Sequence, residues 1–142
     1  MPRQAAQRII MHKSLWTFHL DANYQKGAEI VLHQCIKALE YTPIDCNMEP
    51  ASSGGFRATL SLQHTPGLSW PEALYEVMQH AQRLGVGWVL LGHLDSDPHA
   101  ILNRDFHSRI KIPGLSWAEW QLAPVEPGVA AAPADTPAGN AS

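Results

Sequence analysis

Polar and apolar side chains alternate in three stretches of the chain, at residues 14–20, 44–49 and 56–63. A period of two places successive side chains on opposite faces of a β-strand. We therefore predict three half-buried strands, with Trp16, Phe18 and Phe56 on the inward face. The outward face then carries His19 and Arg57, together with the acidic residues Asp45 and Glu49 and several uncharged polar residues.

A helical spacing replaces this alternation after the first strand. Asp21 or Asn23 is the expected N-cap, and the helix is expected to end near Glu40, before Pro43. Its inward stripe is predicted to contain Tyr24, Ala28, Val31, Leu32, Cys35, Ala38 and Leu39.

The second predicted helix has stronger local signals. Ser69 and Glu72 have the spacing of a capping box around Trp70 and Pro71. An apolar stripe from Ala73 to Leu84, which includes Met78, predicts the buried side of this helix. Gly85 stands where a glycine commonly ends a helix.

Residues 86–94 are almost entirely apolar, which predicts a central strand covered on both faces. A turn is expected at 95–98, a short strand at 100–102, and extended or short helical segments at 109–112 and 115–122. The order β-α-β-β-α-β matches the ferredoxin-like arrangement. We therefore predict an α+β fold with an antiparallel sheet, two helices on one face, and a C-terminal hairpin or extension.

Three segments of different composition are expected along the chain. Residues 1–11 are predicted to be a flexible N-terminus, and residues 12–122 a single α+β domain. In residues 123–142, thirteen of twenty residues are Ala, Pro or Gly, which predicts a disordered tail. The sequence Pro-Gly-Leu-Ser-Trp occurs at 66–70 and again at 113–117, and we interpret both copies as starts of helices.

Composition narrows the function classes. A net charge of −3 without a basic run argues against nucleic-acid binding. The longest apolar stretch is far shorter than a membrane span, and the N-terminus has no secretory signal pattern, so a cytoplasmic protein without membrane contact is expected. Cys35 and Cys46 are both predicted to be small buried residues.

Motifs with specific chemistry are missing. The chain has no nucleophile-elbow pattern and no phosphate-binding glycine loop, and no cofactor is expected. His93, Asp95, Asp97 and His99 are spaced two apart, which is compatible with a metal site if the segment is fully extended. Asp-Ser-Asp-Pro is also ordinary turn chemistry. We favour the turn and expect no metal site.

Two function hypotheses remain. The first is a non-catalytic binding or regulatory protein, resembling immunity proteins and antiactivators in kind, that contacts another protein or a second copy of itself. Trp117 and Trp120 would be partly exposed anchors of that contact. The second is a small-molecule-binding protein or enzyme with a pocket on the open sheet face or at a dimer interface. His19, Arg57 and His93 would supply its polar groups, with Asp95 as a further candidate.

Overall fold

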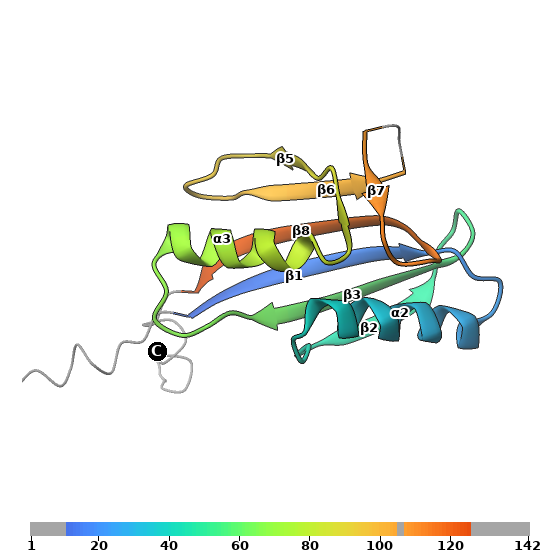
Figure 1. The fold of residues 1–142 in the computed structure, drawn as a ribbon. Helices are drawn as coiled ribbons and strands as arrows, with labels where there is room; N and C mark the ends of the chain where they lie inside the picture. The colour runs from blue at the N-terminus through green and yellow to red at the C-terminus, as the bar shows by residue number, and fades with distance from the viewer. Residues whose placement is uncertain (1–10, 105–106, 126–142) are drawn as a thin grey trace, which may run out of the picture.

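The computed structural model describes residues 11–104 and 107–125. The described residues form two helices and a long antiparallel sheet, which confirms the α+β class. Figure 1 shows that the helices cover one face of this sheet. The elements are β1 (Met11–Leu20), α2 (Gln25–Leu39), β2 (Cys46–Pro50), β3 (Phe56–Gln63), α3 (Trp70–Ala81), β4 (Gly85–Val86), β5 (Val89–Leu91), β6 (His99–Asn103), β7 (Arg109–Ile110) and β8 (Leu115–Val125). Within the described residues, neither helix has the length and apolar character needed to cross a membrane.

The six-stranded sheet has the order β2-β3-β1-β8-β6-β5. The three strands predicted from alternation are present, and β3 lies between β1 and β2. The other neighbour of β1 is β8, from the C-terminal part of the described chain. The predicted ferredoxin-like order would place the strand after α3 in that position, so this exact topology is not confirmed.

The predicted central strand at 86–94 is wrong. The segment divides into β4, which pairs with β7 in a separate two-stranded sheet, and β5, which forms the edge of the main sheet. Gly87 separates them with φ 93°, and a Cβ at this position would lie 2.6 Å from Cα of Ser108. The chain bends at this glycine because only a residue without a side chain fits there.

The core lies between the helices and the sheet. Trp16 of β1 is level with Leu60 of β3 and Trp120 of β8, so their side chains share the helix-facing side. Phe18 is next along the same side, and both aromatic residues of β1 are fully buried, as predicted. Phe56 is partly buried and packs against this hydrophobic core.

Several local predictions need correction. The N-cap of α2 is Tyr24, which is exposed and makes no side-chain capping bond, so neither Asp21 nor Asn23 caps the helix. Cys35 is buried as predicted, but Cys46 is exposed because it lies in the edge strand β2. Strand β8 extends through Ala123 to Val125, past the predicted start of the tail, and residues 126–142 and 1–10 lie outside the described residues.

The two Pro-Gly-Leu-Ser-Trp copies have different structures. The first starts α3, where the predicted capping box is present: Ser69 Oγ accepts from the Glu72 amide, and the Glu72 side chain accepts from the Ser69 amide. The second leads into β8, so its interpretation as a helix start is wrong. Both copies share the turn, since Gly67 and Gly114 have φ 83° and 91°.

Candidate functional site

Three of the predicted site residues lie side by side on the open face of the sheet. His19 of β1 is level with Arg57 of β3 on one side and with Trp117 of β8 on the other. Arg57 Nη2 lies 3.1 Å from Oε2 of Glu49 in an exposed ion pair. The structure therefore forms a row of polar and aromatic side chains across adjacent strands, which we call the open-face row: Arg57, His19 and Trp117.

His93 and Asp95 lie elsewhere, in the connection between β5 and β6. The predicted turn is confirmed, because the amides of Ser96 and Asp97 both donate to the His93 carbonyl, at 3.2 and 2.9 Å. The His93 amide donates to Asp97 Oδ1 at 3.2 Å. Across the described ranges, no group of three or more His, Cys, Asp or Glu side chains is placed to hold a metal ion.

Trp120 is not an exposed anchor. Its side chain is 1% exposed and lies on the helix-facing side of β8, whereas Trp117 faces the opposite side and is half-buried. Alternation along a strand accounts for the difference, since residues three apart must face opposite sides. A charge at Trp120 would therefore disrupt the core and would not report on a partner.

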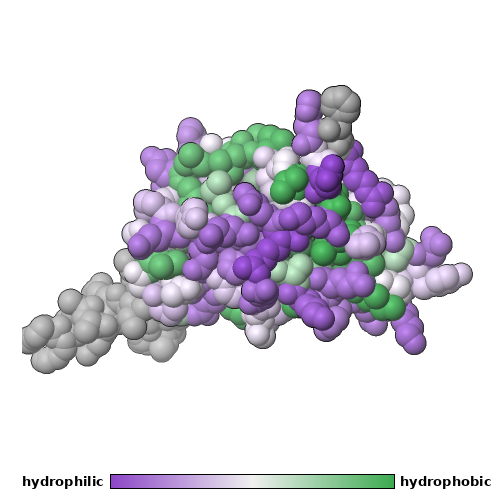
Figure 2. All heavy atoms as spheres, in the orientation of Figure 1, coloured by the Kyte–Doolittle hydropathy of each residue, from purple (hydrophilic) through white to green (hydrophobic). Residues whose placement is uncertain are grey.

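Exposed apolar side chains gather around β5. Val89, Leu90 and Leu91 are 54%, 38% and 39% exposed, although the sequence pattern predicts that they are buried. Figure 2 shows the hydrophobic colour gathered at the top of the molecule, where Figure 1 places β5. Val86, Met78 and Leu94 are also exposed. Contiguous apolar surface of this kind commonly marks a contact site.

A groove lies between α3 and β5 on the helix-facing side of the sheet. It encloses about 260 Å³, and none of its lining residues carries a charged side chain. Its walls include Met78 of α3 and Val86, Trp88 and Leu90 from the β4–β5 segment, and buried Trp120 also lines it. Trp88 is held in place because its indole N–H donates to the carbonyls of Ala81 and Gly85, each at 3.1 Å. We call this feature the α3–β5 groove.

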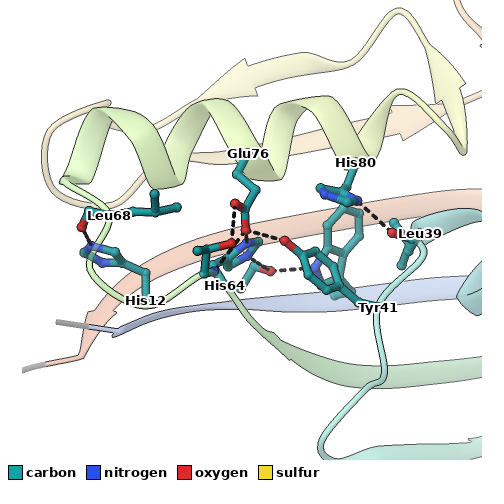
Figure 3. A network of polar contacts seen from close by, with 10 residues as sticks. His12, Leu39, Tyr41, His64, Leu68, Glu76 and His80 are labelled. Carbon is teal, nitrogen blue, oxygen red and sulfur yellow. Dashed lines mark hydrogen bonds and ion pairs between the residues drawn. The ribbon is translucent and has the colours of Figure 1, made fainter. Parts of the chain in front are cut away.

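Helix α3 is attached to the sheet by polar contacts that Figure 3 shows from close by. Glu76 points from the underside of α3 toward the end of β3, where its Oε2 accepts from Nδ1 of His64 at 3.0 Å. The same carboxylate accepts from the Tyr41 hydroxyl and from the amide and hydroxyl of Thr65. These bonds fix the orientation of α3, and hence of the groove wall that it supplies. We call this set the polar network: Ser14, Tyr41, His64, Thr65 and Glu76.

The protonation states in the network follow from its hydrogen bonds. Burial raises the pKa of Glu76, but the bonds from Tyr41, Thr65 and His64 outweigh this effect and lower the pKa to about 2. Burial lowers the pKa of His64, and Glu76 opposes that shift in part. At neutral pH the network thus contains a carboxylate and a neutral imidazole, whose Nδ1–H donates to Glu76.

Ser14, His64 and Glu76 have the hydrogen-bond order of an acyl-transfer triad. Oγ of Ser14 lies 2.6 Å from Nε2 of His64, which contacts Glu76 through its other nitrogen. However, Ser14 and His64 are 0% and 1% exposed, and the Trp16 indole N–H donates to Ser14 Oγ at 2.8 Å. A substrate carbonyl cannot reach this hydroxyl, so the arrangement stabilises the packing of α3 and gives no support for catalysis.

Sequence reasoning did not identify the groove or the network. The groove was missed because residues 86–94 were predicted to be a buried strand. The alternation in the sequence could have predicted the network. His64 continues the inward positions of β3, and Ser14 lies on the inward side of the neighbouring strand β1. Polar residues at inward positions of adjacent strands usually indicate buried hydrogen bonds.

Comparisons with known proteins add no assignment, because no family model, curated protein or solved structure matches the chain.

Proposed function

We propose that this chain is a non-catalytic binding protein that captures another protein through the α3–β5 groove. The observation that carries the proposal is an uncharged groove bordered by exposed apolar side chains from both α3 and β5. Burying such surface against an apolar segment of a partner is the main favourable contribution to protein association. A regulatory role by contact, as in immunity proteins and antiactivators, is consistent with this mode of action.

The size of the groove favours a side chain of a protein over a free ligand. Pockets for drug-sized molecules usually enclose roughly 300–1,000 Å³, and this groove encloses about 260 Å³. Further exposed apolar side chains lie on the same two elements or next to them, at Tyr75 on α3 and at Leu94 after β5. One or two large apolar side chains in the groove, with flanking contacts on this rim, would match both features.

The binding residue that we would test first is Met78. Its side chain is 38% exposed on α3, so a glutamate there can reach water without unfolding the helix. We expect Met78→Glu to weaken partner capture at least tenfold, because it places a charge in an apolar contact (roughly 1.4 kcal/mol or more). Capture is measured by affinity purification from an extract of cells that naturally contain the chain, followed by mass spectrometry.

Ile30→Glu is the matched control. Ile30 is also an exposed apolar residue on a helix, but it lies on α2 and does not line the groove. The wild-type chain and Ile30→Glu should capture the same protein, and folded Met78→Glu should lose it. Undiminished capture by folded Met78→Glu would contradict the proposal.

An alternative function is small-molecule binding at the open-face row. Its support is the cross-strand register, which puts His19 beside Arg57 and Trp117. These groups together suit a flat, anionic molecule, since guanidinium and imidazole contact negative charge and indole contacts a flat face. The groove is the stronger candidate, because Arg57 is already paired with Glu49. Loss of a bound molecule in His19→Ala, with Met78→Glu unchanged, would favour the alternative.

A further inference from the structure

The outer edge of β5 is a second unusual surface. In the sheet order β5 is terminal, and within residues 11–104 and 107–125 its single neighbour in that sheet is β6. Figure 1 shows β5 at the top edge of the sheet. No strand of the described chain pairs with its outer side, so that side presents backbone N–H and C=O groups to a possible partner. Such an edge can accept a further strand.

This edge carries no charged side chain and no proline that would prevent pairing. From Leu84 to Leu94 the sequence contains no Asp, Glu, Lys, Arg or Pro. Val89 and Leu91 are exposed on the open face, and Leu90 is exposed on the helix-facing side. Natural edge strands are usually protected by a charge, a proline, a covering element or a very short length, and of these β5 has the short length, three residues. An added strand would find apolar side chains on both faces of the sheet.

The two ends of β5 have opposite charge. Exposed Asp95 and Asp97 follow its C-terminal end, in the turn before β6. Exposed Arg109 and Lys111 lie toward its N-terminal end, because Val86 is level with Arg109 in the β4–β7 pair and the Lys111 amide donates to the Leu84 carbonyl. A second strand with the same distribution of charge is therefore complementary to β5 when it runs antiparallel.

We propose that β5 pairs antiparallel with β5 of a second copy of this chain. A two-fold axis near Leu90 would join two six-stranded sheets into one continuous sheet and would bring each Asp95 near the other copy's Arg109. A parallel pairing would instead bring like charges together. Two-fold contacts of this kind use the same surface on both subunits. The pairing uses the outer edge of β5, so the groove on its helix-facing side stays open to a partner protein.

Sedimentation equilibrium over a range of protein concentrations tests the pairing. The wild-type chain should reach twice the mass of one chain, and Leu91→Lys or Val89→Lys should remain monomeric with an unchanged circular dichroism spectrum. Leu15→Lys is the matched control: Leu15 is an exposed apolar residue on the same face of the sheet, but in β1, and its variant should still dimerise. A monomeric wild-type chain, or a dimer that survives the β5 substitutions, overturns the proposal.

A charge exchange tests the orientation. Asp95→Arg and Arg109→Asp should each weaken self-association about tenfold, because each places like charges together at both symmetric contacts. An equimolar mixture of the two variants should recover wild-type affinity, since both contacts in the mixed dimer are complementary. No recovery in the mixture overturns the antiparallel arrangement.

The groove variant separates this inference from the proposed function. Met78→Glu should lose partner capture and still dimerise, and Leu91→Lys should be monomeric with an intact groove. If only the groove proposal or only the dimer proposal is wrong, these two variants show which one.

Discussion

The buried histidine in the polar network shows how a single residue determines the position of a helix. His64 donates to Glu76 of α3 through Nδ1 and accepts from Ser14 of β1 through Nε2. A protonated imidazole could no longer accept from Ser14, and the serine hydroxyl would lose its acceptor. A buried polar group without a partner costs about 1–3 kcal/mol, so the attachment of α3 depends on a neutral His64.

Stability is expected to fall in acid because of this network. The pKa of His64 is lowered from 6.5 in the folded protein, so the unfolded chain binds more protons once the pH falls below 6.5. The free energy of unfolding therefore decreases in that range. Glu76 adds a second loss, between its ordinary pKa of 4.5 and the folded value of about 2. Urea unfolding at pH values above and below 6.5 measures the first effect.

His64→Gln provides the control for this prediction. Glutamine can donate to Glu76 and accept from Ser14, but it does not titrate. The variant should lose most of the stability change just below pH 6.5 and keep the change at lower pH. A wild-type protein that becomes more stable as the pH falls through 6.5 would contradict the account of the network.

At the scale of elements, the accuracy of the sequence predictions depended on how local each signal was. The start of α3 was predictable because Ser69, Pro71 and Glu72 act within one turn of helix. The second Pro-Gly-Leu-Ser-Trp copy has the same turn, but Ala118 replaces proline after the tryptophan. There β8 pairs with β1, and this contact between distant parts of the chain determines an extended structure. A short motif cannot report such a contact.

The capping box of α3 gives a prediction at this scale. Ser69→Ala removes the acceptor for the Glu72 amide, and the free energy of unfolding should fall by about 1 kcal/mol. Chemical denaturation monitored by tryptophan fluorescence measures the change. Ser116→Ala is the comparison: Ser116 holds the same place in the second copy, where its hydroxyl donates to the His19 carbonyl and caps no helix. A loss in Ser69→Ala of less than a few tenths of a kcal/mol would argue against the capping role.

For the whole molecule, the strands and helices before residue 85 were largely predictable and the rest of the sheet was not. Alternation identified β1 and β3, and it identified their inward faces, because both strands have one buried and one open side. The prediction of a central strand at 86–94 was wrong because an apolar composition is equally compatible with a buried central strand and with an exposed contact edge. Only the pairing of β8 with β1, which displaces this segment to the edge, distinguishes them.

The α3–β5 groove exists because β8 pairs with β1 and so leaves residues 86–94 at the edge of the sheet. Because β5 lies at the edge, residues that would otherwise be core become the wall of a groove and the border of the sheet. Of the site residues predicted from sequence, His19, Arg57 and Trp117 share the open-face row. That row lies on the opposite side of the sheet from the α3–β5 groove. The two surfaces can therefore be tested separately.

Hydrogen–deuterium exchange on the chain with and without its captured protein tests the proposed function most directly. We expect slower exchange on partner binding in residues 78–82 and in residues 86–90, which line the groove. Exchange in β3, which carries Arg57, should be unchanged. Protection of β3 and of the middle of β8, with α3 and residues 86–90 unaffected, would contradict the proposed function and place the contact on the open-face row.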